Sequence, residues 1–265
     1  MTEDSADLLL PGPIRGVRVD ITTRCNLRCV YCAVSSKNYV GADMPEEVVK
    51  RAISLITNLV PQYPGLVVFL NGNGETTYRK DWINLVTPLL ESGATVRLQS
   101  NFAKEFTDRE LEVLACMNVI TISIDSADRS LLAKLRRHVD VRQIVTNIAM
   151  VRAAAVKMLR KPPTFTFACG LYDKNSLFVD GLARLAISLG IKAVNFWNLH
   201  DHGHSDSRVD GDDSVHPLDD LTDVELRPRV EVIHGAIELL RAHNVTVGIH
   251  AAFVNILARR VGIDV

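Results

Sequence analysis

The most constraining feature of the sequence is a regular alternation of short apolar runs, rich in β-branched residues, with longer segments of helical period. It extends from residue 16 to about residue 198. This alternation is typical of βα units whose strands share one parallel sheet. Six such units predict an incomplete barrel or an open sheet instead of eight-fold closure. The expected strands cover residues 16–22, 66–70, 95–100, 119–124, 164–169 and 192–199.

The segments between these strands carry helix signals. Glu46 and Glu47 suit the positive end of a helix. Thr107, with Glu110 three residues later, predicts a capping box for the helix that follows. Gly190 is placed to end another helix. In addition to the helix after Thr107, helices are expected over about residues 46–60, 79–92, 128–136, 141–156, 175–189 and 229–243.

The composition changes after residue 200, where "HDHGHSDSRVDGDDSVHPLDD" is acidic and rich in histidine. A stretch without apolar periodicity predicts a long loop. His200, His202 and His204 could bind a divalent metal or serve as acid and base, but a hydrated surface loop is the simpler explanation. We expect this loop to act as a lid that excludes water. The predicted organisation is an N-terminal extension (1–15), a core (16–200), and a lid loop with a C-terminal extension (201–265).

Charge and hydropathy exclude several classes of partner. The 30 basic residues nearly balance the 31 acidic ones, giving a net charge of -1. There is therefore no global electrostatic footprint for nucleic acid or an anionic membrane. The acidic N-terminus does not resemble a secretory signal, and no segment has the roughly 18 apolar residues of a membrane span. We expect a soluble, cytoplasmic protein.

The run "CNLRCVYC" places Cys25, Cys29 and Cys32 on one short stretch after the first strand, in a chain with five cysteines. Three thiolates at this spacing favour a metal site in a reducing compartment. A 4Fe-4S cluster takes four cysteines when complete, so three would leave one iron open. Zinc is an alternative that needs a fourth ligand, and His138 and Cys116 lie far away in sequence. Simple reduced cysteines in a turn are the remaining alternative.

The same run resembles the cluster loop of the radical S-adenosylmethionine (SAM) enzymes, a Cys-x3-Cys-x-aromatic-Cys motif in which Tyr31 occupies the aromatic position. The resemblance implies one 4Fe-4S cluster, with SAM chelating the open iron. It further implies that SAM is cleaved to methionine and a 5'-deoxyadenosyl radical, chemistry that belongs to the cofactors. The implied fold is the partial (βα)6 TIM-like barrel of this family, with a short C-terminal helical extension.

The segment "NGNGET" at residues 71–76 resembles the family's Gly-x-Gly-Glu-Pro segment, which meets the amino group of SAM. Gly72, Gly74 and Glu75 match, and Thr76 replaces the proline. Glycines allow close approach of the backbone, and a carboxylate can accept hydrogen bonds from an ammonium group. The alternative is a simple turn between strand and helix.

Two more segments carry the resemblance. "LQSN" contains Ser100 and Asn101 where relatives have polar residues facing SAM. "SIDSADRSLLAKLRR" resembles the branch that includes the molybdenum-cofactor enzyme and the SPASM-type peptide maturases. It implies that Ser123 and Asp125 serve the ribose and that Arg136 pairs with the SAM carboxylate. A solvated helix face is the alternative for Arg136.

The last strands supply further candidates. The resemblance places Trp197 or Phe196 near adenine, and alternation allows only one of them to line the interior. The alternative is that both pack in the core. Cys169 ends the fifth strand, at the edge where such a barrel gathers its active site. It could donate a hydrogen atom to a substrate radical, or it could be a buried apolar residue. Cys116 is expected in the core.

The sequence therefore predicts a radical SAM enzyme that abstracts hydrogen from a natural product, a nucleoside or sugar, or a peptide. A flavodoxin or ferredoxin is the implied electron donor. No cysteine follows Cys169, which argues against the auxiliary clusters of the SPASM enzymes. The competing classes are an iron-sulfur electron-transfer protein and a zinc-stabilised binding module.

Overall fold

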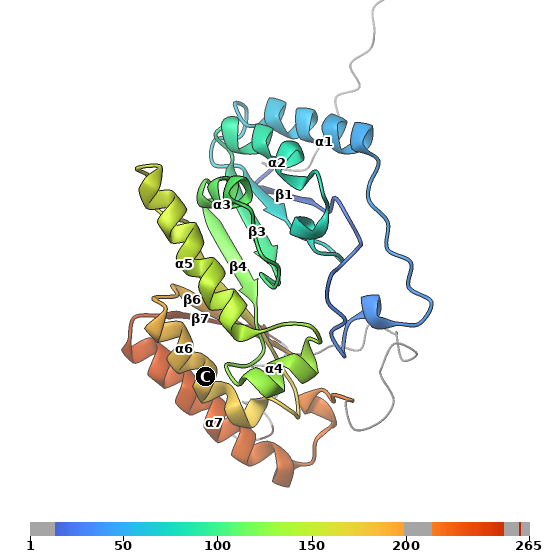
Figure 1. Cartoon of the computed structure of the whole chain (residues 1–265). Coiled ribbons are helices and arrows are strands. Elements are labelled where there is room, and N and C mark those ends of the chain that lie inside the picture. The colour runs from blue at the N-terminus through green and yellow to red at the C-terminus, as the bar shows by residue number, and fades with distance from the viewer. Residues whose placement is uncertain (1–13, 199–213, 252–259, 261–265) are drawn as a thin grey trace, which may run out of the picture.

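The computed structural model describes residues 14–198, 214–251 and 260. Seven parallel strands form one sheet in the order β1-β2-β3-β4-β5-β6-β7, so every strand lies beside its neighbour in sequence (Figure 1). The α/β architecture is that of a partial TIM-like barrel, as expected. The strands are β1 (Gly16–Val19), β2 (Val67–Leu70), β3 (Thr95–Ser100), β4 (Val119–Ser123), β5 (Thr164–Leu171), β6 (Ala193–Asn198) and β7 (Thr246–Ile249).

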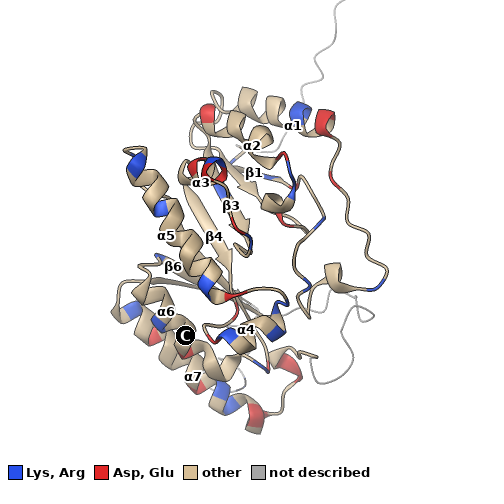
Figure 2. Cartoon of the chain, viewed as in Figure 1, with Lys and Arg blue, Asp and Glu red and all other residues tan. Residues whose placement is uncertain are grey.

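The helices lie on the outer side of the sheet, whereas the segment between β1 and the first helix crosses on the other side (Figure 1). Acidic and basic side chains are interspersed along these helices (Figure 2). None of the described helices combines the length and apolar character needed to cross a bilayer. The helices are α1 (Glu46–Leu59), α2 (Trp82–Glu91), α3 (Asp108–Ala115), α4 (Arg129–Leu135), α5 (Val141–Lys157), α6 (Val179–Ser188) and α7 (Asp223–Ala242).

The hydrophobic core lies between the sheet and the helices. Along β2 and β3 the buried side chains alternate with exposed ones: Val68 and Leu98 are buried, whereas Phe69 and Arg97 are exposed. Such alternation puts one set of side chains on each face of a strand. The helix-facing set is apolar and closely packed, so the opposite, concave face of the sheet is free to carry polar groups.

The structure refines several sequence-based expectations. The Thr107 capping box is confirmed, and Gly190 adopts a positive φ of 62° just beyond α6. The sheet has one strand more than the six expected, because β7 pairs with β6. Helix α7 begins at Asp223, earlier than expected. The predicted lid histidines His200, His202 and His204 lie outside the described residues, and the boundary at residue 200 stays a prediction.

Candidate active site

The three cysteines lie on the segment that follows β1, which we call the cysteine loop (residues 23–36). Two contacts fix its shape from within: the Cys32 amide donates to the Cys29 carbonyl (3.0 Å), and the Ser35 hydroxyl donates to the same oxygen (2.6 Å). A third contact anchors it from outside, where the Val30 amide donates to the carbonyl of Leu135 in α4 (2.9 Å). The loop is thus tied to α4, at the edge where the strands end.

Burial dominates the electrostatics of these thiols. It raises the pKa of Cys25 to about 11 and that of Cys29 to about 12. The neighbouring thiol of Cys32 raises both pKa values further, because the sulfur atoms are close enough to interact electrostatically. Metal ions favour the thiolate because they supply positive charge. The chemistry of this donor set therefore fits a metal cluster better than it fits free, reactive thiols.

Hydrogen bonds also reach the sulfur of Cys25. The Leu27 backbone amide donates to Sγ at 3.4 Å, and the side-chain nitrogen of Asn101 (Nδ2) lies 3.8 Å from it. Donors to sulfur are a means by which proteins tune iron-sulfur clusters. Among the described residues, no three Cys, His, Asp or Glu side chains converge to hold a single metal ion. A cubane cluster does not require such convergence, because each thiolate binds a different iron.

The turn after β2 packs directly on the cysteine loop. A Cβ atom on Gly74 would lie 2.3 Å from the Thr22 carbonyl oxygen and 2.6 Å from that of Arg24. A Cβ on Gly72 would lie 1.8 Å from the Asp20 carboxylate. The next amide, that of Glu75, donates to the Arg24 carbonyl at 2.8 Å. At position 74 only glycine permits this approach, because the added Cβ would meet backbone atoms, and it brings the second strand end against the cysteine loop.

The Glu75 carboxylate is buried and fully occupied by donors of the chain itself. It accepts hydrogen bonds from the Thr77 amide (3.1 Å), the Thr77 hydroxyl (2.7 Å), the Ser100 hydroxyl (2.9 Å) and the Asn101 amide (2.7 Å). The Asn101 side chain in turn donates to Asn26 of the cysteine loop (2.8 Å). Glu75 therefore joins the ends of β2 and β3, and Asn101 joins that unit to the cysteine loop.

Asp125 and Arg136 form a buried ion pair. The guanidinium donates from Nε (2.6 Å) and Nη2 (3.2 Å), while the Gly170 amide (3.0 Å) and the Tyr31 hydroxyl (2.6 Å) donate to the same carboxylate. Burial alone would lower the pKa of Arg136, but the Asp125 charge outweighs it and holds that pKa well above the usual value. In this arrangement Arg136 contacts Asp125 and stacks over the Tyr31 ring (5.7 Å).

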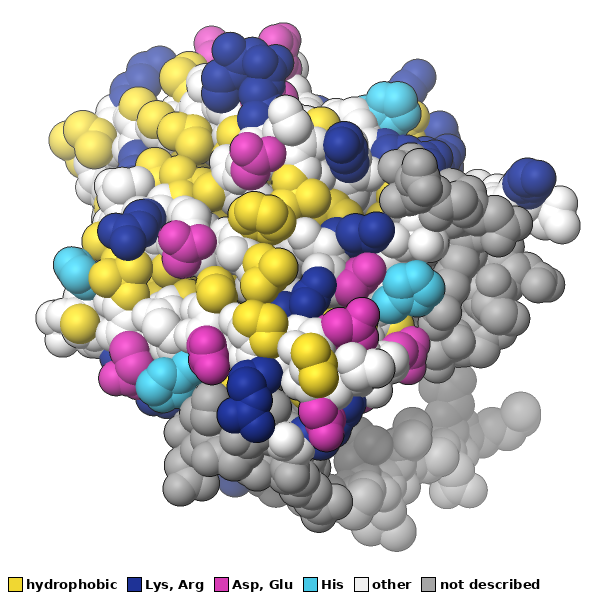
Figure 3. All heavy atoms as spheres, turned by 90° about the horizontal axis from the view of Figure 1, so that it is seen from below, with side chains coloured by type: hydrophobic (Ala, Val, Ile, Leu, Met, Phe, Trp, Pro, Cys, Tyr) yellow, Lys and Arg dark blue, Asp and Glu magenta, His cyan; other side chains and the backbone are white. Residues whose placement is uncertain are grey.

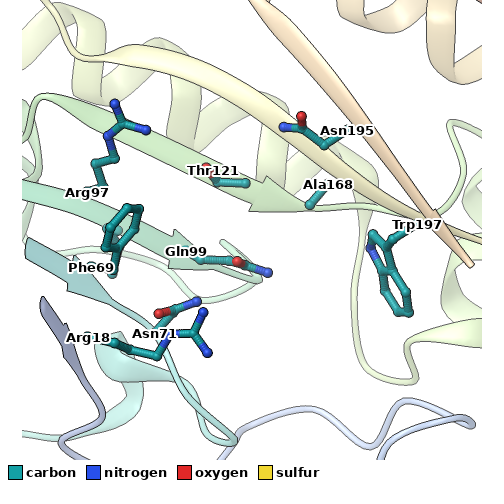
Figure 4. A pocket seen from close by; sticks show the side chains of 10 residues that line it. Arg18, Phe69, Asn71, Arg97, Gln99, Thr121, Ala168, Asn195 and Trp197 are labelled. Atoms are coloured by element: carbon teal, nitrogen blue, oxygen red, sulfur yellow. The ribbon is translucent and has the colours of Figure 1, made fainter. Parts of the chain in front are cut away.

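Beside the cysteine loop, the concave face of the sheet encloses an open cavity of about 360 Å³ (Figure 4). Trp197 marks the end next to the loop, since its ring lies 6.0 Å from that of Tyr31. Phe196 points to the opposite face and is buried in the core. The cavity is lined by Arg18, Phe69, Asn71, Arg97, Leu98, Gln99, Thr121, Ala168, Asn195 and Trp197.

Five of the predicted site residues fall into two sets. Ser123 and Trp197 lie on the cavity side of the sheet, where Ser123 accepts a hydrogen bond from Gln99 (3.3 Å). Glu75, Asp125 and Arg136 are buried and engaged with the chain. In this structure the two carboxylates accept hydrogen bonds from groups on neighbouring strands.

Cys169 lies away from the cavity. Its side chain is fully buried on the helix-facing side of β5, 3.9 Å from the Asn175 amide nitrogen. Burial also raises the pKa of its thiol well above the usual value. Ala168 lines the cavity in its place, so the geometry gives the predicted hydrogen donor no support. Cys116, expected in the core, is only partly buried at the end of α3.

Sequence reasoning missed the polar residues that line the cavity, including four on β1, β3 and β6. These four alternate with buried apolar residues on their strands, and this period-2 pattern was the available signal. They are Arg18, Arg97, Gln99 and Asn195.

The fold and the site define a parallel α/β protein that carries a three-cysteine loop at the end of its first strand. The family model described as the Radical SAM superfamily matches residues 19–175. This match covers more than half of the chain, and the chain belongs to the radical SAM superfamily of enzymes. The superfamily uses a 4Fe-4S cluster and SAM, which confirms the cofactors expected from the motif.

Curated relatives match in sequence. The GTP 3',8-cyclase of Caulobacter vibrioides is 32% identical over 148 residues, which are 53% of this chain and 41% of the relative. The probable GTP 3',8-cyclase of Pyrococcus abyssi is 26% identical over 117 residues, or 44% and 37% of the two chains. The matches therefore span less than half the length of these relatives.

Solved structures share the fold. Streptococcus suis SuiB bound to the precursor peptide SuiA matches with a TM-score of 0.65 and 14% identity, over 91% of this chain and 50% of that one. The enzyme anSMEcpe with bound AdoMet and the Cp18Cys peptide gives a TM-score of 0.63 at 14% identity, over 89% and 63%.

Proposed function

We propose that this protein cleaves SAM reductively and uses the resulting radical to abstract hydrogen from a substrate held in the cavity of the sheet. When bound, the 4Fe-4S cluster and SAM supply the electron and the 5'-deoxyadenosyl radical. Cys25, Cys29 and Cys32 are the proposed cluster ligands. The observation that carries the proposal is their placement on one anchored loop, beside the cavity, in a chain of this superfamily.

The other predicted residues have proposed roles in holding SAM beside the cysteine loop. Ser123 and Trp197 face the cavity side and are the proposed contacts for the ribose and the adenine. Gly72 and Gly74 allow the backbone after β2 to approach the loop, where SAM would meet it. Ser100 and Asn101, buried at the end of β3 and hydrogen-bonded to Glu75, are the proposed polar residues of this strand end toward SAM. The proposed positioning residues, which act through their neighbours, are Tyr31, Glu75, Asp125 and Arg136.

The rest of the organisation is proposed as follows. Residues 16–200 form the core, and residues 201–265 supply a lid loop and a C-terminal extension, with β7 completing the sheet. Enzymes of this superfamily act on small molecules or peptides. The cavity in the sheet favours a small molecule here, and a flavodoxin or ferredoxin is the proposed electron donor.

The test is anaerobic reconstitution with iron and sulfide, followed by assay of SAM cleavage with dithionite. We expect a brown protein with on the order of four irons per chain and formation of 5'-deoxyadenosine. Cys25→Ser, Cys29→Ser and Cys32→Ser should each abolish cleavage, whereas the matched control Cys116→Ser should retain it. A colourless zinc protein would identify a binding module, and a stable cluster without SAM cleavage would identify an electron carrier.

A further inference from the structure

The cavity of the sheet contains two arginines at one level. Arg18 of β1 and Arg97 of β3 are register partners of Phe69 on the intervening strand β2. Neighbouring strands lie about 4.8 Å apart, so the two backbones are separated by about 10 Å. Both side chains line the cavity, and Figure 4 shows them on either side of the Phe69 ring. Both guanidiniums therefore line the same cavity from one level of the sheet.

These two cations form no ion pair in the described part of the chain. No described carboxylate forms an ion pair with either arginine. None of the residues that line the cavity is Asp or Glu. The Arg97 guanidinium instead stacks on Phe69, 5.7 Å from the ring centroid. Two like charges held at one level without a carboxylate create a local positive potential inside the cavity.

This concentration of charge differs from the outer surface. On the face in Figure 3, cationic and anionic side chains are interspersed among hydrophobic ones. The chain as a whole is nearly neutral, with a net charge of -1. A pair of like charges inside a concave site therefore favours binding of an anion there and not general attraction of polyanions.

The cavity also offers an unused hydrogen-bond acceptor. The side-chain oxygen of Asn71 is buried and accepts no hydrogen bond from the described residues. A buried acceptor without a donor is costly, and a ligand hydroxyl or amine would satisfy it. Asn71 directly follows the last residue of β2 and lines the same cavity as the two arginines.

We propose that Arg18 and Arg97 bind the anionic group, a phosphate or a carboxylate, of the substrate. This inference rests on the proposed function, since it assigns the substrate class of the same site. Arginine matches such groups because its planar fork donates two hydrogen bonds to two oxygens. Trp197 lies near the cysteine loop, and the arginines lie at the other end of the cavity (Figure 4). The anion therefore anchors the substrate at the end remote from the loop, and the remainder extends toward Trp197.

The test measures binding of two probes, sodium pyrophosphate and sodium succinate, to the reconstituted, SAM-bound chain by titration calorimetry. Arg18→Gln and Arg97→Gln should each weaken binding of the accepted probe by about tenfold or more. Arg51→Gln removes an exposed arginine on α1 and serves as the matched control; it should leave the affinity unchanged. Arg18→Lys and Arg97→Lys keep the charge and should retain part of the affinity.

A second measurement needs no variant. The accepted probe should protect Arg18 and Arg97, but not Arg51, from modification by phenylglyoxal, as read by mass spectrometry. Binding of pyrophosphate alone assigns a phosphate-bearing substrate, binding of succinate alone assigns a carboxylate, and binding of both supports an anionic group of either kind.

The inference is overturned if neither probe binds. It is also overturned if the Arg18 and Arg97 variants bind the probe as tightly as the wild type and the probe does not protect these two arginines from modification. A wild-type protein that cleaves SAM but binds neither probe leaves the proposed function standing. A protein that binds a probe through these arginines but does not cleave SAM refutes only the proposed function.

Discussion

At the scale of single residues, the Asp125 carboxylate connects the cysteine loop with the ends of two strands. It receives donors from Tyr31, Arg136 and Gly170, and both members of its ion pair are buried. Buried charges are stable only when paired and hydrogen-bonded. The same two residues that resemble SAM contacts by sequence therefore also stabilise the structure around the cysteine loop.

Arg136→Met is expected to lower the free energy of unfolding by about 3–5 kcal/mol, because it leaves Asp125 buried without a counter-ion. Arg142→Met breaks an exposed ion pair with Asp140 and should cost less than about 1 kcal/mol. Urea unfolding of the cluster-free chain measures both. The double variant Asp125→Asn, Arg136→Met should cost less than the sum of the single variants. Equal losses for Arg136→Met and Arg142→Met would contradict the role given to the buried pair.

At the scale of elements, helix α3 begins with a capping box that is linked to its neighbours. The Glu110 carboxylate accepts from the Thr107 amide (2.9 Å), the Trp82 indole (2.8 Å) and the Lys104 ammonium. Burial raises the pKa of Glu110, but the hydrogen bonds from Lys104, Thr107 and Trp82 outweigh burial, so that the pKa lies below its usual value. One carboxylate thus fixes the start of α3 and its contact with α2.

The lowered pKa makes this contribution dependent on pH. The pKa of glutamate in an unfolded chain is about 4.3. The stabilising contribution of Glu110 is therefore fully present above that pH, and it is lost as the pH falls through the lower pKa of Glu110 in the folded chain. Glu110→Gln should therefore cost about 1–3 kcal/mol at neutral pH, with a difference from wild type that shrinks in acid. Unfolding in urea across the acid range measures this. Glu112→Gln, an exposed position on α3, is the control; a difference for Glu110→Gln that does not vary with pH would contradict the account.

At the scale of the whole molecule, the site depends on chain segments that are distant in sequence and meet at the strand ends. Gly74 lies against the backbone of residues 22–24, and Asn101 donates to Asn26. The Val30 amide donates to Leu135 in α4. These contacts place the cysteine loop against the ends of β2 and β3 and against α4.

Gly74→Ala is expected to disturb this assembly, because its Cβ would press on the backbone carbonyl oxygens of Thr22 and Arg24. We expect a loss of stability of about 1–3 kcal/mol, as for other overpacked sites, and a lower iron content after reconstitution. Gly235→Ala is the matched control: nothing lies within 4 Å of the added Cβ in α7, and it should stabilise the helix by up to about 1 kcal/mol. Normal iron content in Gly74→Ala would show that the close approach is dispensable.

Much of the secondary structure was predictable because it depends on local signals. Strand periodicity, the Thr107 capping box and the cysteine spacing are all encoded within a few residues. Local signals were insufficient at α7, which was expected to begin at about residue 229 and instead includes Pro228. The capping box of Thr222 and Glu225, together with burial of Leu226, starts that helix earlier. Here helix packing and capping outweigh the cost of an internal proline.

The sequence by itself determined the order of strands and helices, the placement of three cysteines on one loop, and the resemblance to the radical SAM enzymes. Only the tertiary structure decided which side chains meet. In β5 nearly every residue is buried, so alternation could not tell the face of Cys169 from that of Ala168. The Glu75 and Asp125 contacts and the pairing of β7 join residues far apart in the chain, and their geometry depends on the packed sheet and not on any local pattern.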